Sequence, residues 1–304
     1  MKVLVTGAAG FIGSHLCERL IRDGFEVYGL DNLSRGSADA IKALKRSGLR
    51  FHEIDVRDHH EIKAVLKKIK PDFIIHLAAL TDTEESFRKP KLYMEVNAVG
   101  TRNIVEGADE VGSKRLIYAS SAAVYGIPAK LPITEDHPAK PISPYGLSKL
   151  AGEAHVKSRV KHESVILRIF NVYGPGQNPQ YAGVITKFVD RLKSGEPPII
   201  FGDGLQVRDF IHVYDVADAF IKSLDAELGQ NEVINIASGK PVKIIDLAET
   251  MMKMFKLDLK PVHQPPRPGD IRESYADISK AYQLLRWKPR ITLEEGLHGL
   301  IEEF

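Results

Sequence analysis

The first half of the chain alternates short apolar segments with longer segments of helical periodicity. Several apolar segments are continuous, as at Ile74-Ile75 and Leu116-Ile117, which is typical of strands in a parallel sheet covered by helices on both faces. The expected strands are Lys2–Thr6, Glu26–Leu30, Arg50–Ile54, Phe73–Leu77, Arg115–Ala119 and Val165–Phe170. The expected helices are Gly10–Arg22, Ala38–Arg46, Asp58–Ile69, Tyr93–Val111 and Pro144–Lys161. This alternation predicts an α/β fold with a doubly wound parallel sheet of the Rossmann type.

The pattern changes after Phe170, where breaker residues become frequent. Two Pro and two Gly lie between Asn171 and Pro179, and further Pro and Gly clusters follow. We therefore expect a dinucleotide-binding domain over residues 1–170 and a smaller, mostly substrate-binding domain over residues 171–304. Two later segments, Arg208–Val213 and Val233–Ala237, still have strand character. They predict that the chain returns to the first domain near residues 205–240, so that the two domains are interleaved.

Composition and charge narrow the class of protein. The 304 residues are 43% hydrophobic and 27% charged, with a formal net charge of +2, so neither disorder nor a nucleic-acid partner is indicated. No apolar segment approaches the roughly 20 residues of a membrane span. The single cysteine, Cys17, excludes an internal disulfide, and the start of the chain resembles no signal peptide. We therefore expect a cytoplasmic protein. We expect no metal site, because the histidines show no ligand spacing.

A glycine-rich turn follows the first expected strand and opens a helix. Gly7, Gly10 and Gly13 occur in the sequence TGAAGFIG. The first glycine permits a sharp turn, the second lets the backbone approach a pyrophosphate, and the third lets the helix pack on the strand. This context predicts a dinucleotide site.

Acidic residues at the ends of the next strands refine this prediction. Asp31 can accept hydrogen bonds from the adenosine ribose and would repel a 2′-phosphate, which favours NAD over NADP. A cap or turn role for Asp31 is the structural alternative, and Arg35 leaves NADP open. Asp55 can reach the adenine amino group or can cap the helix that begins near Asp58, and the sequence does not decide between these roles.

Tyr145 and Lys149 are spaced so that a phenol and an ammonium lie on one helix face. A free tyrosine is a weak base at neutral pH, and a nearby cation would lower its pKa. Ser120 and Ser121 follow the fifth expected strand, and residues just beyond such a strand face the cofactor crevice. A serine hydroxyl there can bridge to a substrate oxygen that Tyr145 deprotonates.

Together these motifs resemble the extended short-chain dehydrogenase/reductases, and specifically the nucleotide-sugar epimerases. The motifs include TGxxGxxG, Asp31-Asn32-Leu33, Asp55-Val56, His76-Leu77-Ala78-Ala79, Asn97-Ala-Val-Gly-Thr, SSAAVYG, Tyr145-Gly-Leu-Ser-Lys149 and Arg267-Pro-Gly-Asp270. By resemblance, Ser121, Tyr145 and Lys149 are catalytic and Ser120 is structural. The resemblance implies NAD contacts at Gly7, Gly10, Phe11, Ile12, Gly13, Asp31, Asn32, Asp55, Val56, Leu77, Ala78, Ala79, Asn97, Tyr145 and Lys149. It implies substrate contacts at Ser121, Asn171, Arg208, Arg267 and Asp270, with Asp209 as a partner that would make Arg208 merely structural.

The implied reaction is 4-epimerisation of a UDP-hexose, UDP-galactose or UDP-glucose, through a transient 4-keto sugar. Ala122 and Ala123 occupy positions where dehydrating relatives carry Asp and Glu, so dehydration is disfavoured. A UDP-glucuronate 4-epimerase and a non-catalytic NAD-binding regulatory protein are the alternatives. Ser274 aligns with a position where, in the family, a bulky residue limits the size of the sugar's C2 substituent. A small residue there leaves room for an N-acetyl group, which implies that N-acetylhexosamine forms are also accepted. The resemblance further implies a homodimer in which the helices Tyr93–Val111 and Pro144–Lys161 form a four-helix interface.

Overall fold

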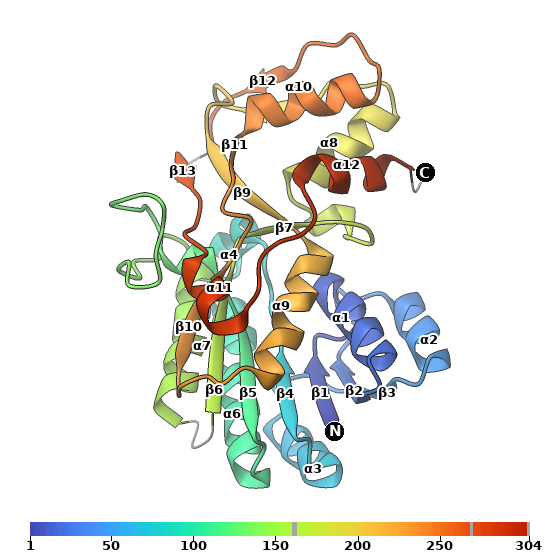
Figure 1. Ribbon diagram of the computed structural model, residues 1–304, viewed down its shortest axis with the longest axis vertical. Helices are drawn as coiled ribbons and strands as arrows, with labels where there is room; N and C mark the ends of the chain where they lie inside the picture. Colours follow the sequence, from blue (N-terminus) through green and yellow to red (C-terminus); the bar gives the residue numbers. More distant parts are fainter. Residues whose placement is uncertain (160–162, 268–269, 303–304) are drawn as a thin grey trace.

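The computed structural model describes residues 1–159, 163–267 and 270–302. Figure 1 shows a sheet flanked by helices at the bottom and a smaller lobe at the top. The sheet strands begin near the N-terminus, at the lower end, and point toward the smaller lobe. The carboxyl ends of the strands therefore face that lobe, and these are the ends at which doubly wound sheets bind ligands.

Seven parallel strands form the main sheet in the described parts of the chain, in the order β10-β6-β5-β4-β1-β2-β3. Their bounds are Lys2–Thr6 (β1), Glu26–Asp31 (β2), Arg50–Glu53 (β3), Phe73–His76 (β4), Arg115–Ser121 (β5), Glu163–Ile169 (β6) and Glu232–Ile236 (β10). The order reverses beside β1, and the glycine turn follows β1. The doubly wound parallel sheet predicted from the sequence is confirmed.

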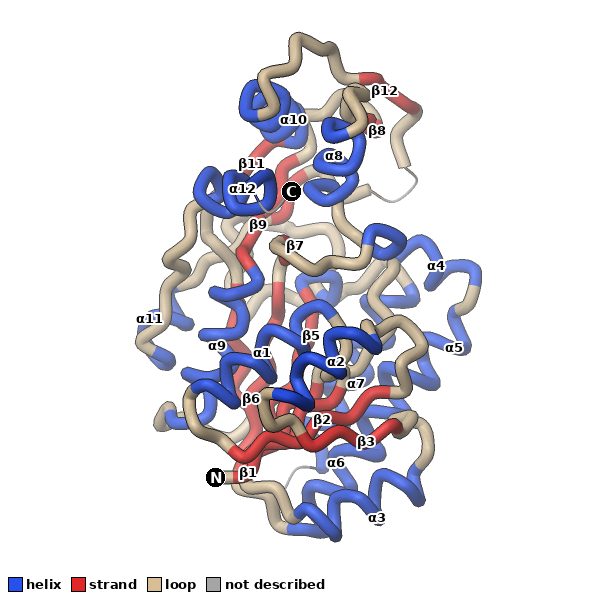
Figure 2. The backbone as a smooth tube through the Cα atoms, turned by 90° about the vertical axis from the view of Figure 1, so that its right-hand side faces the viewer, coloured by secondary structure: helices blue, strands red, loops and turns tan. Residues whose placement is uncertain are grey.

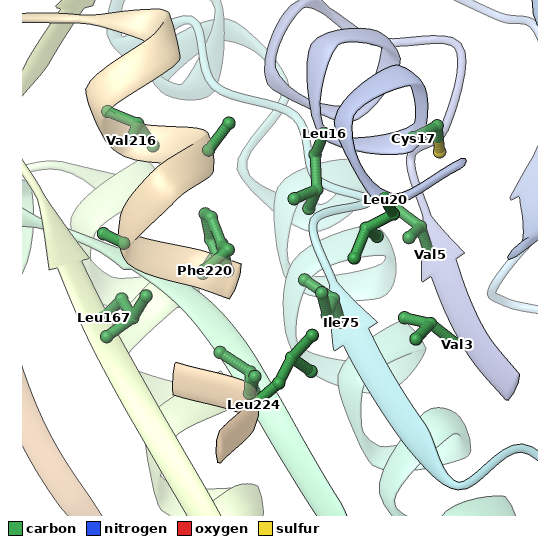
Figure 3. Close-up of a cluster of buried hydrophobic side chains, with 14 of the residues drawn as sticks. Val3, Val5, Leu16, Cys17, Leu20, Ile75, Leu167, Val216, Phe220 and Leu224 are labelled. Atoms are coloured by element: carbon green, nitrogen blue, oxygen red, sulfur yellow. The ribbon is translucent and has the colours of Figure 1, made fainter. Parts of the chain in front are cut away.

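Successive residues of the central strands enter different cores, which explains their continuous apolar runs. Val3 and Val5 of β1 pack with one cluster, whereas Leu4 packs with the other. The first cluster includes side chains of α1, α2, α9 and α11, and Figure 3 shows Leu16 and Phe220 meeting the sheet there. The second cluster includes α3, α6 and α7. These helices span Phe11–Arg22 (α1), Ala38–Arg46 (α2), His59–Ile69 (α3), Gly100–Val111 (α6), Pro144–Arg159 (α7), Val213–Asp225 (α9) and Ser279–Leu285 (α11).

The smaller lobe has its own core and sheets, seen beyond the main sheet in Figure 2. Its strands are Asn171–Tyr173 (β7), Ile199–Phe201 (β8), Val207–His212 (β9), Pro241–Lys243 (β11), Val262–Gln264 (β12) and Glu273–Ser274 (β13). β9 pairs with β7, β11 and β13, while β12 pairs with β8. The helices of this lobe are Val184–Lys193 (α8), Ile244–Met254 (α10) and Leu293–Glu302 (α12), with a short 3-10 turn, η3, at Pro179–Tyr181.

Two elements differ from the sequence-based expectation. Of the late strand segments, Val233–Ala237 joins the main sheet as β10, but Arg208–Val213 belongs to the sheet of the smaller lobe as β9. The single helix expected at Tyr93–Val111 is divided into Pro90–Met94 (α5), a π-helical turn at Glu95–Val99 (η1) and α6. The predicted end of Pro144–Lys161 lies partly outside the described residues. Within those residues, no helix is long and apolar enough to span a membrane.

Candidate active site

Tyr145 and Ser121 meet where the sheet faces the smaller lobe. Ser121 is the last residue of β5, and Tyr145 lies in the first turn of α7, where Ser143 caps the chain by accepting from the Gly146 N–H at 3.1 Å. The Tyr145 side chain is 9% exposed. Burial raises the pKa of its phenol, and a hydrogen bond with Ser121 opposes that shift. Tyr145 therefore presents a buried phenol beside the Ser121 hydroxyl, at the carboxyl end of β5.

Lys149 lies one turn after Tyr145 and is almost fully buried, at 3% exposed. Its ammonium nitrogen lies 4.5 Å from the ring centroid of Tyr118 in β5. Burial lowers the pKa of Lys149 to about 7, and the Glu153 carboxylate acts in the opposite direction. The side chain is thus close to half-protonated at neutral pH, and its charge responds to nearby groups.

Glu153 forms a buried network that sequence reasoning missed. Arg168 of β6 donates to both of its carboxylate oxygens, from Nε at 2.8 Å and Nη2 at 2.7 Å. The Ser120 hydroxyl donates to Glu153 Oε1 at 2.6 Å. Lys149 and Glu153 continue the four-residue spacing that begins at Tyr145, so that spacing was the available signal. The network fixes α7 against the ends of β5 and β6.

A second buried network lies beneath the cleft at His76. Its Nδ1 is 2.6 Å from Thr6 Oγ1, and its Nε2 is 3.0 Å from Thr101 Oγ1. Burial lowers the pKa of His76 to about 3, with a further contribution from the Lys149 charge. His76 is therefore neutral at physiological pH and joins β1, β4 and α6.

The glycine turn has the geometry expected of a phosphate-binding loop. Gly7 has a φ of +71°, and a side chain on it would come 2.8 Å from the Ala78 nitrogen. A side chain on Gly13 would collide with the Gly7 carbonyl oxygen. Gly10 precedes α1 and has no side chain to cap it, while Phe11 and Ile12 open the helix. The first N–H groups of α1 therefore donate to no capping side chain.

Asp31 connects the end of β2 to the glycine turn. Its carboxylate accepts from the Ala9 N–H at 3.0 Å and from the Leu33 N–H at 2.8 Å. Burial raises the pKa of Asp31, and these two hydrogen bonds oppose the shift. The N-cap of α2 is Ser37, so the cap alternative for Asp31 is wrong, although its bond to Leu33 is a turn contact. Each carboxylate oxygen retains a lone pair for a ligand.

Asp55 lies beside Asn32 at the same edge. Asn32 Nδ2 donates to Asp55 Oδ2 at 2.9 Å, and Arg57 donates to both Asp55 oxygens. The Arg57 hydrogen bonds hold the pKa of Asp55 at about 2. Asp58, which accepts from the Glu61 N–H, is the N-cap of α3. The helix-cap alternative for Asp55 is therefore wrong.

The segment after β4 lies against the glycine turn, where Ala78 comes close to Gly7. It contains Leu77, Ala78 and Ala79. The Asn97 amide donates to the Leu80 carbonyl at 2.9 Å and accepts from its N–H at 2.8 Å. Asn97 also donates to Ser148 of α7 at 2.9 Å. It thus holds this segment against the helix that carries Tyr145. Val56, which was expected to contact the cofactor together with Asp55, is buried against Gly100.

Apart from Ser121, which ends β5, the expected substrate residues lie in the smaller lobe. Arg208 is ion-paired with Asp270, while burial lowers the pKa of its guanidinium. Asp209, on the opposite face of β9, accepts instead from Ser238, Gly239 and Ala276, so the interpretation that pairs it with Arg208 is wrong.

Two further residues expected to contact the substrate, Arg267 and Asn171, also belong to this lobe. The Arg267 guanidinium carbon lies 3.9 Å from the ring centroid of Phe201. Asn171 Nδ2 donates to the Asp209 carbonyl at 2.9 Å. Arg267 and Asn171 are both exposed, so the smaller lobe presents cationic and amide donors.

Comparison with known proteins identifies the family. Residues 3–237 match the NAD dependent epimerase/dehydratase family. The chain belongs to this family. It is 39% identical to a putative UDP-glucose 4-epimerase of Methanocaldococcus jannaschii, over 98% of this chain and 97% of the relative.

Solved structures of related epimerases superpose on nearly the whole chain. The UDP-glucose 4-epimerase of Thermotoga maritima, solved with UDP-glucose, has a TM-score of 0.94 and 36% identity, covering 99% of this chain and 98% of the other. The UDP-N-acetylglucosamine 4-epimerase of Methanobrevibacter ruminantium, in complex with UDP-N-acetylmuramic acid, has a TM-score of 0.91 and 35% identity, covering 100% and 99%.

The residues of this epimerase-family chain fit NAD. Side chains at Gly7 and Gly13 would fill the cradle of the turn, and the uncapped start of α1 suits a pyrophosphate. Asp31 would supply a carboxylate for the ribose, at the end of β2. Arg35, which left NADP open, is ion-paired with Glu85, so its charge is already balanced. Within the described residues, no three His, Cys, Asp or Glu side chains gather as a metal site requires.

Proposed function

We propose that this family member is a UDP-hexose 4-epimerase that interconverts UDP-galactose and UDP-glucose. The observation that carries the proposal is the buried Tyr145 phenol, hydrogen-bonded to Ser121 and one helical turn from Lys149. Similarity over nearly the whole chain to UDP-glucose 4-epimerases supports this substrate class.

In this proposal, each residue handles one part of the reaction at C4 of the sugar. Tyr145 takes the proton of the C4 hydroxyl and later returns it, while Ser121 holds the same oxygen by a hydrogen bond. Lys149, when protonated, stabilises the phenolate and holds the nicotinamide ribose. When bound, NAD would accept a hydride from C4 and give it back to the opposite face.

The smaller lobe holds the nucleotide in this proposal. Arg208 and Asn171 meet the diphosphate, since guanidinium groups donate two parallel hydrogen bonds to phosphate oxygens. Arg267 and Asp270 hold the distal phosphate and the uridine ribose. The Arg208–Asp270 ion pair holds the guanidinium in place.

The direct test is incubation of the purified protein with UDP-galactose and no added cofactor, followed by NMR of the products. Formation of UDP-glucose is expected, and it would establish both the reaction and a retained cofactor. Product that forms only after NAD is added would keep the reaction and revise the cofactor affinity. Absence of product in both cases would refute UDP-galactose as substrate, and a panel with UDP-glucuronate would follow.

We further propose that UDP-N-acetylhexosamines are accepted. Ser274 pairs with Arg208 in the ladder between β13 and β9, so a small residue lies next to the expected diphosphate site. Similarity to a UDP-N-acetylglucosamine 4-epimerase supports this extension. A Ser274→Tyr variant should lose activity on the N-acetyl sugar selectively. Equal loss on both sugars would refute the idea.

We also propose a cytoplasmic homodimer. Leu147 of α7 is 53% exposed, and Phe87 of the neighbouring helix α4 (Thr83–Arg88) is 58% exposed. Contiguous exposed apolar patches mark interaction surfaces. A four-helix interface formed by α5–α6 and α7 of two copies would cover Leu147, and Phe87 lies on a helix that contacts α7. Cys17 is a buried free thiol, which suits a reducing compartment.

A further inference from the structure

A charged pair joins the two segments on either side of the glycine turn. Arg35 lies in the loop after β2, and its guanidinium is ion-paired with Glu85 of α4, which follows β4. In the sheet, β1 lies between β2 and β4. The glycine turn is the segment that follows β1. The Arg35–Glu85 ion pair therefore connects the segments after β2 and β4, on either side of the turn where a dinucleotide pyrophosphate is expected.

The loop that carries Arg35 is held directly against the turn. The Ser37 N–H donates to the Ala9 carbonyl at 2.8 Å. A side chain on Gly36 would collide with the Ala9 methyl group. Arg35 is thus anchored one residue away from a contact with the phosphate-binding loop, and its side chain extends from there to α4.

Glu85 is a strong anchor for that side chain. The Tyr93 hydroxyl donates to its Oε2 at 3.0 Å, and Lys89 Nζ donates to its Oε1 at 2.9 Å. Although burial opposes ionisation, the hydrogen bonds from Lys89 and Arg35 lower the pKa of Glu85 to about 2. The side chains of Arg35 and Glu85 are only 20% and 14% exposed. The pair is therefore charged at every working pH and partly shielded from solvent.

Arg35 also contacts the smaller lobe. Its guanidinium carbon lies 4.4 Å from the ring centroid of Tyr181, in η3 after β7. A cation above an aromatic face is an attractive contact. One side chain consequently connects the loop after β2, helix α4 and the smaller lobe.

The same cluster reaches the reaction centre through Tyr93. This side chain is fully buried, and its ring meets the ring of Tyr145 edge to face, with centroids 6.4 Å apart. Movement of Glu85 would therefore disturb the packing around Tyr145 as well as the crevice.

We propose that Arg35 and Glu85 are cofactor-retaining residues, whose ion pair closes the crevice over bound NAD and must open before NAD can leave. A cofactor that is regenerated in each cycle does not need to dissociate, so a closed crevice costs the reaction nothing. The proposal rests on the NAD dependence of the family and does not depend on the identity of the sugar.

The test measures release of NAD in the absence of any sugar nucleotide. Protein loaded with radiolabelled NAD is mixed with excess unlabelled NAD, and the retained label is followed by rapid filtration. Arg35→Gln and Glu85→Gln should each accelerate release about tenfold, because the segments after β2 and β4 can then separate without breaking a partly shielded ion pair. The double variant should be no faster than the faster single variant, because both changes break one ion pair.

The matched control is Arg88→Gln on the same helix. Arg88 pairs with Glu84 at the surface, and both side chains are more than half exposed. The rate of NAD release from this variant should therefore stay within about twofold of the parent. Thermal unfolding with saturating NAD checks that every variant is folded. Should Glu85→Gln not fold, Tyr181→Leu replaces it and should also accelerate release, whereas Tyr181→Phe keeps the ring and should not.

Two results would overturn the proposal. One is release from Arg35→Gln at the rate of the parent and of Arg88→Gln. The other is a double variant whose acceleration equals the product of the two single accelerations, since the two residues would then act independently. A protein that fails to epimerise UDP-galactose but shows the expected release rates would leave this inference standing and refute only the sugar assignment.

Discussion

At the scale of single residues, the proposed reaction depends most on the pKa of the Tyr145 phenol. The phenol is buried, which raises its pKa, and Ser121 is the hydroxyl that opposes this shift. A buried phenol held by one hydroxyl is well suited to exchange a proton with a sugar oxygen but not with bulk water. Its hydroxyl oxygen, rather than its ring, should therefore carry the proposed chemistry.

Tyr145→Phe removes that oxygen and retains the ring that packs on Tyr93. We expect kcat for epimerisation to fall about 10³-fold, within the range attributed to general acid–base catalysis. NAD content, measured by absorbance after denaturation, should remain that of the parent. Tyr282→Phe, at a surface tyrosine that is 56% exposed, is the control and should keep full activity. Activity of Tyr145→Phe within tenfold of the parent would contradict the assignment.

His76 gives a prediction for the pH dependence of stability. Its pKa falls from 6.5 in the unfolded chain to about 3 in the folded protein because the ring is buried. Between these values the unfolded chain binds a proton that the folded protein does not, so the free energy of unfolding decreases as pH falls below 6.5. From pH 7 to pH 5, His76 should account for a loss of about 2 kcal/mol.

The measurement compares urea unfolding of the parent and His76→Gln at both pH values. Other titrating groups are common to the two proteins, so the smaller pH-dependent loss in the variant reports His76 alone. Equal losses in the parent and His76→Gln would show that the ring is not held neutral.

At the scale of elements, a four-residue spacing places the functional side chains of helix α7 on one face. A buried ion pair with β6 fixes the position of the helix. Tyr145, Lys149 and Glu153 follow at intervals of four, and Arg168 fixes the last of them from β6. Both partners of this ion pair are buried, with side chains 5% and 1% exposed. Removal of one partner leaves a charge in a poorly solvated place.

Arg168→Gln should therefore lower the free energy of unfolding by about 3–5 kcal/mol. Chemical denaturation provides the measurement. Arg19→Gln breaks an exposed pair with Asp23 on α1 and should cost at most about 0.5 kcal/mol. Similar costs for the two variants would mean that the buried network contributes no more than a surface contact.

The helical segment before β5 shows where sequence periodicity fails. The expected single helix Tyr93–Val111 contains a π-helical turn at Glu95–Val99, and Asn97 lies within this turn. Its amide is fully used by Leu80 and Ser148. The contact with Leu80 joins this turn to the segment after β4, 17 residues earlier in the chain, and such a contact leaves no trace in the spacing of apolar residues. The local pattern predicted the helix but not its irregular turn.

At the scale of the whole molecule, the exposed apolar residues predict assembly. Leu147 lies on α7, as do Tyr145 and Lys149. Unlike those two buried side chains, Leu147 is largely exposed. Leu147→Glu should convert the proposed dimer to a monomer, because burial of an unpaired carboxylate in an apolar interface is unfavourable. Light scattering coupled to size-exclusion chromatography measures the mass.

The control is Tyr282→Glu on α11, whose side chain is exposed on another part of the molecule. It should keep the mass of the parent. A parent of monomer mass would refute the dimer outright. Dimer mass for Leu147→Glu would mean that α7 does not form the interface.

The sequence by itself determined the features that depend on neighbouring residues. The parallel sheet was predictable because central strands buried on both faces are continuously apolar, as at Ile74-Ile75. The glycine turn, and the placement of Tyr145 and Lys149 on one helix face, were predictable because they depend on backbone geometry over a few residues. The position of Asp31 at the end of a strand was predictable for the same reason.

Only the tertiary structure decided which distant groups meet. Sequence proximity suggested Asp209 as the partner of Arg208, but alternate residues of β9 face opposite sides, and the partner is Asp270. Arg35, expected at most near a ribose phosphate, pairs with Glu85. Of two similar strand segments, only Val233–Ala237 joins the main sheet. Each of these outcomes depends on packing between segments far apart in the chain, which local pattern does not encode.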